Sequence, residues 1–239
     1  MGSFENQRIM KVIGLIGGMS WESTLTYYKV INEEVKRQLG GFSSARCIIY
    51  SVNFDEIEKL QRADKWEESG LLLNEAAKSL ERAGADFFIL CTNTMHKVEA
   101  QIVNGVKIPF YHIAEMTANE IIARKIGKIA LLGTIYTMEG DFYKSKLMER
   151  GLEVIVPEKE DRETVNRIIF GELCMGRIEA DSRQKYLNII SKMVEQGAQG
   201  VILGCTEIGL LIKQSDLTIP VFDTTIIHAQ KAAQLSMQE

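Results

Sequence analysis

Cysteine and histidine, the residues that most often build metal sites and disulfide frameworks, are scarce in this chain of 239 residues. The cysteines are Cys47, Cys91, Cys174 and Cys205, and the histidines are His96, His112 and His228. No CxxC spacing occurs, and the histidines are too widely spaced for a local metal-binding motif. We therefore expect reduced thiols, no bound metal, and histidines placed on helix surfaces or in hydrogen bonds between domains.

Blocks of like charge and long hydrophobic runs are also missing. The net charge is only −4, with 25% charged residues, so no basic surface for nucleic acid or for an anionic membrane is expected. No segment is long and apolar enough to be an export signal or a membrane span, and we expect a soluble protein in the cytoplasm that binds small molecules. Residues 1–9 are polar and are interpreted as an N-terminal extension.

Nucleotide-binding fingerprints are absent as well. Gly14, Gly17 and Gly18 do not form a GxGxxG pattern, and no GK[ST] phosphate loop occurs, so we expect no nucleotide cofactor. The content of 46% hydrophobic residues is nevertheless sufficient for the cores of two small lobes.

Short aliphatic runs alternate with longer amphipathic stretches, which is the pattern of an α/β protein with parallel sheets flanked by helices. Strands are predicted at residues 11–16, 45–53, 86–90, 105–111, 128–132 and 200–203. Helices are predicted at residues 21–39, 65–83 and 225–236, and a shorter one at 97–102.

Three pairs of segments match in the same order, which indicates an internal duplication. Residues 85–92 align without a gap on 198–205, residues 106–111 on 217–222, and the first strand with its glycine turn on residues 128–133. A single pair would also be explained by the Val, Ile and Leu content common to parallel strands. We predict a first lobe of residues 10–113 plus 223–239 and a second lobe of 114–222, with Thr92 and Cys205 at equivalent positions.

Polar residues follow the two aligned strands, at the sheet edge where ligands of α/β proteins bind. Asn93 and Thr94 offer donors to a carboxylate, although Thr94 is equally explained as a helix cap. Cys205 lies before a short helix whose N-terminus would lower its pKa, and a buried structural cysteine is the alternative. Glu207 would orient an ammonium group or Cys205, or simply begin the helix.

Three motifs resemble the cofactor-independent aspartate/glutamate racemase family: GGMSWEST at residues 17–24, CTNTMH at 91–96 and GCTE at 204–207. The resemblance extends from Met10 to the end of the chain. It is closest to the branch specific for L-aspartate and L-glutamate, in which threonine replaces one of two catalytic cysteines. It implies two α/β lobes related by a pseudo-twofold axis, a substrate cleft between them, no pyridoxal phosphate (PLP) or metal, and a homodimer.

The resemblance also implies roles for individual residues. Cys205 and Thr92 would act on opposite faces of the α-carbon, with Cys205 taking the proton of the L-substrate and the D-substrate handled poorly. The implied substrate-binding residues are Met19, Gln61, Thr92, Asn93, Thr94, Thr206 and Glu207. Arg62 and Arg167 are candidates for holding the distal carboxylate.

Cys91 stands beside Thr92 and competes with it for the catalytic position. Neighbouring residues of a strand point to opposite faces, so only one of the two can reach a substrate. We choose Thr92, because Asn93 and Thr94 then match the family motif without a gap, and we expect Cys91 in the core.

Two other functions remain open at this point. A related decarboxylase, or a cis-trans isomerase of dicarboxylates such as maleate, would share the cysteine motif. A non-catalytic two-lobed amino-acid-binding protein would use the same kind of cleft.

Overall fold

The computed structural model describes residues 10–238, which divide into two compact units. Unit 1 comprises residues 10–91, 100–111 and 229–238, and unit 2 comprises residues 92–99 and 112–228. The extension expected at residues 1–9 lies outside the described residues. Residues 92–99 belong to unit 2, whereas the sequence analysis placed them in the first lobe. The predicted lobe boundaries themselves remain a prediction.

Unit 1 contains a three-stranded parallel sheet in the order β2 (Cys47–Ser51), β1 (Ile13–Gly17), β3 (Phe87–Leu90). The register places Ile13 opposite both Cys47 and Phe87. The strand predicted at residues 105–111 is wrong, since only Phe110 forms a single parallel bridge, to Phe88. Pro109 has no backbone N–H to donate, which limits pairing at this position.

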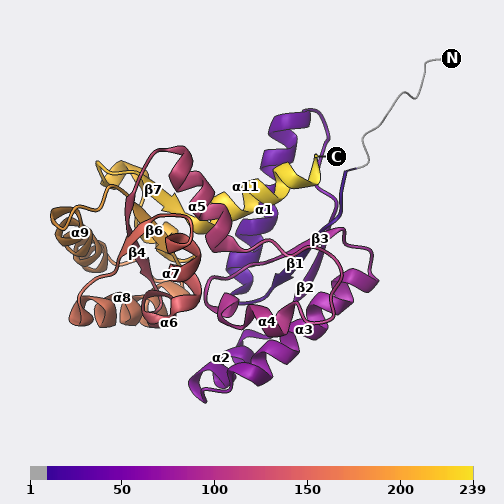
Figure 1. Ribbon diagram of the computed structural model, residues 1–239, viewed down its shortest axis with the longest axis horizontal. Helices are drawn as coiled ribbons and strands as arrows, with labels where there is room; N and C mark the ends of the chain where they lie inside the picture. Colours follow the sequence, from indigo (N-terminus) through magenta and orange to yellow (C-terminus); the bar gives the residue numbers. More distant parts are fainter. Residues whose placement is uncertain (1–9, 239) are drawn as a thin grey trace. The chain divides into compact units, whose positions relative to one another are not determined.

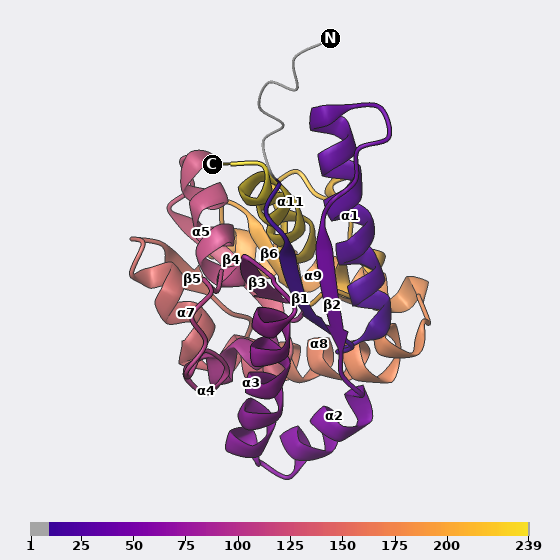
Figure 2. The ribbon, with the colours of Figure 1, turned by 90° about the vertical axis from the view of Figure 1, so that its right-hand side faces the viewer.

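Helices cover both faces of this sheet (Figures 1 and 2). On one face, α1 (Trp21–Leu39) and the C-terminal part of α11 (Thr224–Ser236) pack on Ile13 and Leu15 in a core that includes Tyr27. On the other face lies α3 (Trp66–Arg82), and α2 (Phe54–Arg62) packs against α3. Helix α1 begins where the Ser20 side chain accepts a hydrogen bond from the Ser23 N–H at 3.3 Å.

Unit 2 contains a four-stranded parallel sheet in the order β5 (Glu153–Ile155), β4 (Lys128–Gly133), β6 (Val201–Gly204), β7 (Val221–Asp223). Alternate residues of β4 and β6 face two separate cores. One core is closed by α8 (Lys159–Gly171) and α9 (Ala180–Glu195), and the other by α5 (Ile113–Ala123) and α7 (Asp141–Met148). The α/β prediction, with parallel sheets flanked by helices, is confirmed in both units.

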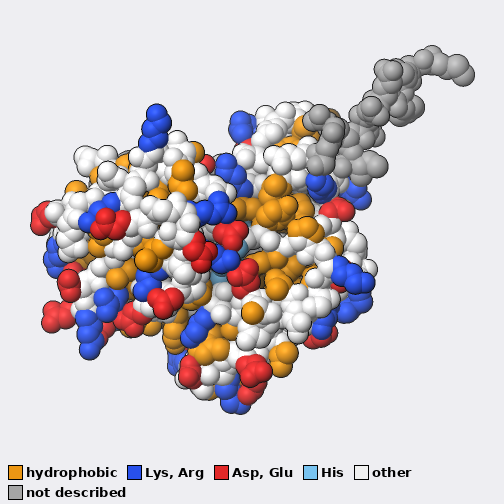
Figure 3. Space-filling model, in the orientation of Figure 1, with side chains coloured by type: hydrophobic (Ala, Val, Ile, Leu, Met, Phe, Trp, Pro, Cys, Tyr) orange, Lys and Arg blue, Asp and Glu red, His pale blue; other side chains and the backbone are white. Residues whose placement is uncertain are grey.

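The remaining helical segments are short and lie in the connections. They are η1 (Thr94–Val98), α4 (Glu99–Ile102), α6 (Ile135–Glu139), η2 (Leu173–Met175), α10 (Ile208–Leu211) and η3 (Gln214–Asp216). None of the described helices is long and apolar enough to cross a membrane. On the face that Figure 3 shows, acidic and basic side chains are intermixed.

Candidate active site

The carboxyl ends of three strands of unit 2 each lead directly into a polar or reactive side chain. Thr134 follows β4, Cys205 follows β6 and Thr224 follows β7. Because β4, β6 and β7 are neighbours in one parallel sheet, their ends meet at the same edge, where ligands bind in open α/β sheets. Residues 92–99, which follow β3 along the chain, belong to the same unit.

Asn93 connects its segment to this edge. Its side chain is 3% exposed, and Nδ2 donates a hydrogen bond of 3.0 Å to Thr224 Oγ1. Thr224 Oγ1 in turn donates to the carbonyl of Leu203, one of the residues of β6, at 2.9 Å. Asn93 Oδ1 has no hydrogen-bond partner among residues 10–238. A buried acceptor of this kind is costly unless a ligand or water supplies a donor.

Thr94 lies beside Thr134, with 3.1 Å between the two hydroxyl oxygens. Thr134 Oγ1 is also 3.2 Å from Thr137 Oγ1, so three hydroxyls form a chain across η1 and α6. The capping alternative for Thr94 does not hold, because the N-cap of η1 is Asn93 and no side chain caps this segment. The Thr94 hydroxyl is therefore occupied by a tertiary contact between two elements of unit 2.

Cys205, Thr206 and Glu207 form a compact hydrogen-bonded group. Cys205 Sγ donates to Glu207 Oε2 at 3.0 Å, and Thr206 Oγ1 donates to the same oxygen at 2.6 Å. Cys205 and Glu207 are each 9% exposed. Glu207 is the N-cap residue of α10, as the helix-start interpretation expected, but its side chain makes no capping bond and hydrogen-bonds Cys205 and Thr206.

The expectation that a helix N-terminus lowers the pKa of Cys205 is also wrong. Burial raises its pKa well above the ordinary value, and the negative charge of Glu207 acts in the same direction. The backbone N–H of Glu207 hydrogen-bonds the sulfur and opposes this rise, but does not reverse it. Helix α10 has only four residues, too few to provide the dipole that would stabilise a thiolate at its N-terminus. Cys205 is a thiol in the ligand-free protein.

His96 supports the segment that carries Thr92. Its Nε2 accepts a hydrogen bond of 3.3 Å from the Ile113 N–H, and its side chain also bonds the backbone of Thr92 and Asn93. Burial lowers the pKa of His96, so the ring is neutral at physiological pH. The helix-surface placement expected for the histidines is wrong, because His96, His112 and His228 are at most 3% exposed.

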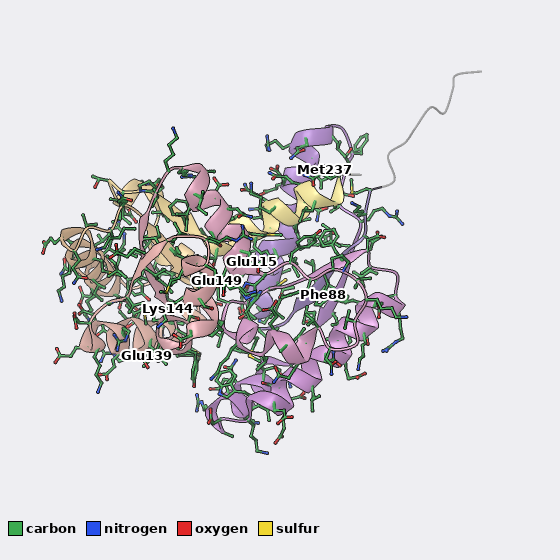
Figure 4. The ribbon with its side chains drawn as sticks, in the orientation of Figure 1. Phe88, Glu115, Glu139, Lys144, Glu149 and Met237 are labelled. Carbon is green, nitrogen blue, oxygen red and sulfur yellow. The ribbon has the colours of Figure 1, made fainter. Side chains whose placement is uncertain are left out.

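His112 packs against His96, with 4.3 Å between the two ring centroids, and lies next to a group of charged side chains. His112 Nδ1 accepts from the Ala114 N–H at 3.0 Å and caps α5, while Nε2 lies 3.9 Å from Glu99 Oε2. Lys146 Nζ bridges Glu99 at 3.6 Å and Glu115, labelled in Figure 4, at 2.9 Å. These contacts tie residues 92–99 to α5 and α7.

The other residues expected at the site lie in unit 1 or on the surface. Met19 follows the glycine turn after β1 and is 4% exposed, and Gln61 is buried on α2. Arg62 is exposed and pairs with Glu58, and exposed Arg167 on α8 contacts Thr164 Oγ1 at 3.4 Å.

The expectation for Cys91 is confirmed. It is fully buried in the core of unit 1, and burial raises its pKa far above the ordinary value.

Three supporting residues were missed in the sequence: Thr134, Thr224 and His96. Thr134 and Thr224 share one signal, since each is the first residue after a strand of a parallel sheet. His96 has no such signal, because its role depends on the distant Ile113. Within residues 10–238, no group of three or more His, Cys, Asp or Glu side chains is arranged to hold a metal ion.

Comparisons with known proteins find similarity to amino-acid racemases. The family model described as Asp/Glu/Hydantoin racemase matches residues 16–232. The broad specificity amino-acid racemase RacX of Bacillus subtilis (strain 168) is 24% identical over 232 residues, covering 92% of this chain and 95% of RacX.

Solved structures agree. A candidate Asp/Glu racemase from Yersinia pestis is 53% identical with a TM-score of 0.91, covering 96% of this chain and 100% of that one. An aspartate racemase homologue from Pyrococcus horikoshii OT3 is 42% identical with a TM-score of 0.83, again covering 96% of this chain and 100% of that one.

Proposed function

This chain belongs to the Asp/Glu/hydantoin racemase family, and we propose that within it the chain racemises acidic amino acids, with L-glutamate and L-aspartate as its main substrates. Membership makes it an amino-acid racemase that works without PLP. The choice of acidic substrates rests on the motifs at residues 17–24, 91–96 and 204–207.

We assign the two proton-transferring roles to Cys205 and Thr92. Cys205 removes the α-proton of the L-substrate, and Thr92 works on the opposite face of the α-carbon. One observation supports this pairing above the others: the Thr224 hydroxyl bonds both Asn93 and the Leu203 carbonyl, and thus links the segment of Thr92 to the strand that precedes Cys205. Such a link holds two reacting groups at a fixed separation, which proton transfer to and from one carbon requires.

Substrate binding then follows from the polar groups around these two residues. The unpartnered Oδ1 of Asn93 is an acceptor for the substrate ammonium group. The hydroxyl of Thr94 is a donor to the α-carboxylate, where negative charge develops as the α-proton leaves. Thr206 belongs to the proposed set as well, although its hydroxyl hydrogen is donated to Glu207 Oε2. Met19 and Gln61 complete the proposed set.

The range of substrates should be tested with neutral as well as acidic amino acids. RacX is by name a broad specificity racemase, so neutral amino acids belong in any test of this chain. We also infer a homodimer, as the family resemblance implies, and sedimentation equilibrium tests it directly.

Exchange of the α-hydrogen with solvent is the decisive measurement. In D2O, the wild-type protein should incorporate deuterium at the α-carbon of L-glutamate or L-aspartate. The circular-dichroism signal of the amino acid should decay toward zero as the racemate forms. The Cys205→Ala variant should lose this exchange, whereas Cys47→Ala, a half-buried thiol of unit 1, should keep it. Exchange that persists in Cys205→Ala would move the base to another residue.

The same assay separates the alternatives. A parallel incubation with maleate and an arylmalonate detects isomerase or decarboxylase chemistry. Binding of an amino acid without any exchange would identify a non-catalytic binding protein.

A further inference from the structure

His96 is the buried histidine of unit 2 that contacts the segment of Thr92. Its side chain is 1% exposed, and its ring centroid lies 4.3 Å from that of His112 and 6.2 Å from that of His228. Burial and the two neighbouring rings lower its pKa, so the ring is neutral at physiological pH. A neutral imidazole carries hydrogen on only one of its two nitrogens, and its hydrogen-bond partners determine which one.

The contacts of His96 place this hydrogen on Nδ1. Nε2 accepts a hydrogen bond of 3.3 Å from the Ile113 N–H, so Nε2 keeps its lone pair. The ring also hydrogen-bonds the backbone of Thr92 and Asn93, and both bonds favour the protonated ring. Hydrogen bonds with that effect are donated by the ring to carbonyl oxygens. Because Nε2 is already an acceptor, Nδ1 is the nitrogen that donates.

We propose that His96 is a positioning residue, whose Nδ1–H holds the backbone carbonyls of Thr92 and Asn93 and takes no part in proton transfer. This assignment rests on the proposed function, because Thr92 is there one of the two proton-transferring residues. It adds a role for a histidine that the reaction itself does not use.

Anchoring two successive carbonyls fixes the backbone that carries the Thr92 side chain. The carbonyl and the N–H of a planar trans peptide point in opposite directions, so the direction of the Thr92 carbonyl also sets that of the Asn93 N–H. The Asn93 side chain is fixed independently, by its hydrogen bond of 3.0 Å to Thr224. Residues 92 and 93 are therefore held by His96 at the backbone and by Thr224 at the side chain.

The same contacts exclude His96 as a base or a relay for Thr92. A general base needs a lone pair that faces the proton it takes. The lone pair of Nε2 is bonded to the Ile113 N–H, and the Nδ1 hydrogen is directed at carbonyl oxygens. A relay would require a charged ring in a site that is 1% exposed, or a change of tautomer that breaks the bond with Ile113.

The tautomer can be measured by NMR without any substrate. In protein labelled with 15N-histidine, multiple-bond 1H–15N correlations identify the nitrogen that carries hydrogen, and the His96 signals are those that disappear in His96→Asn. We expect hydrogen on Nδ1 at neutral pH. Hydrogen on Nε2, or a charged His96 ring at neutral pH, would overturn the proposal.

Two variants separate the two contacts of the ring. His96→Asn keeps a donor near the place of Nδ1, whereas His96→Gln places its amide near that of Nε2. Each variant loses one contact, so urea denaturation should show similar losses of stability. The kcat for racemisation should nevertheless fall about tenfold to a hundredfold in His96→Gln, since small displacements of a reacting group have effects of this size. His96→Asn should recover most of that kcat.

The control is His112→Asn, which makes the same replacement in the neighbouring ring and keeps a residue that caps α5. It should retain the wild-type kcat. An equally low kcat in His96→Asn and His96→Gln is the result expected of a proton relay and would overturn the positioning role, as would wild-type kcat in both. If His96→Gln does not fold, a His96→Asn rate near that of the wild type supports the proposal, and a hundredfold loss contradicts it.

Failure of this proposal is distinguishable from failure of the proposed function. Absence of α-hydrogen exchange in the wild-type protein overturns the proposed function, whereas the NMR result for His96 does not depend on activity. Wild-type exchange together with hydrogen on Nε2 overturns only the role of His96.

Discussion

Asn93 donates a hydrogen bond of 3.0 Å to Thr224, although the two residues are separated by 131 positions in the sequence. Because the Thr224 hydroxyl donates a hydrogen bond of 2.9 Å to the Leu203 carbonyl, one hydroxyl bonds both segments of the candidate site. Thr225, the next residue, is equally buried, but its hydroxyl has no hydrogen-bond partner in the part of the chain that the structure describes. The pair offers a comparison of two neighbouring threonines with different roles.

Replacement of Thr224 by valine should cost about 1 to 3 kcal/mol in the free energy of unfolding, because Asn93 Nδ2 and the Leu203 carbonyl each lose a partner. The rate of racemisation should fall by about tenfold to a hundredfold, since the Thr92 segment loses its link to β6. Thr225→Val removes only an unpartnered hydroxyl and should leave stability equal or higher. Urea denaturation and exchange kinetics of the two variants test this, and equal losses in both would contradict it.

The identity of the group at position 92 should set the enantiomer preference. A threonine hydroxyl is far harder to deprotonate than a thiol, so the wild-type enzyme should handle D-substrates poorly. Thr92→Cys should raise the ratio of D to L activity, as kcat/KM, by about tenfold or more. Thr92→Ser keeps a hydroxyl and should preserve the wild-type preference. An unchanged ratio in Thr92→Cys, measured by circular dichroism from each enantiomer, would remove Thr92 from the mechanism.

Much of the fold is predictable because strand and helix periods are local properties. The predicted helix at residues 21–39 matches α1, and predicted strands at 86–90 and 128–132 differ from β3 and β4 by one residue at an end. The strand at 105–111 fails because its neighbour Phe88 bonds only the Pro109 carbonyl and the Tyr111 N–H, which makes a bridge rather than a ladder. The apolar pattern of residues 105–111 alone does not reveal that the segment forms a single bridge.

The sequence predicts where the candidate site residues lie along the chain, but it does not predict their electrostatics. Strand ends locate Cys205 and Asn93, since ligands bind where parallel strands end. The direction of the Cys205 pKa shift depends on burial and on Glu207 folding back onto the sulfur, neither of which sequence spacing determines. His96 and Thr224 contact residues far away in the chain, and only the folded structure joins them.

Acid should destabilise the protein through the buried His112. Burial and the nearby charges of Lys146 and His228 lower its pKa from the ordinary 6.5 to about 3. The unfolded chain therefore binds a proton between these values that the folded chain does not. The free energy of unfolding should fall as pH falls from 6.5 to 3, by up to about 1.4 kcal/mol per pH unit from this residue.

The His112→Asn variant isolates this contribution, because asparagine also caps a helix but does not titrate. Glu99 and Lys146 remain as in the wild type, so the difference between the two proteins in the slope of unfolding free energy against pH reports on His112 and on its electrostatic effect on His96. Urea denaturation at a series of pH values measures both slopes. Parallel slopes would mean that His112 is accessible to protons in the folded state.

The turn after β1 should tolerate no side chain at Gly18. Its φ of 92° lies in the left-handed region, and a Cβ there would overlap the backbone carbonyl oxygen of Val52. Gly41, also in unit 1, has a φ of 58° but no atom within 4 Å of a Cβ. Gly41→Ala therefore incurs conformational strain alone, about 1 kcal/mol, whereas Gly18→Ala adds a steric overlap of about 1 to 3 kcal/mol.

The difference in unfolding free energy between Gly18→Ala and Gly41→Ala measures how tightly the turn before Met19 is packed against Val52. Because Met19 follows Gly18 directly, the displaced backbone in Gly18→Ala should also raise KM for the amino acid, while Gly41→Ala should not. Urea midpoints and steady-state kinetics of the two proteins provide both quantities. Equal stability losses, or a KM unaffected in Gly18→Ala, would show that neither the crowding at Val52 nor the position of Met19 matters for substrate binding.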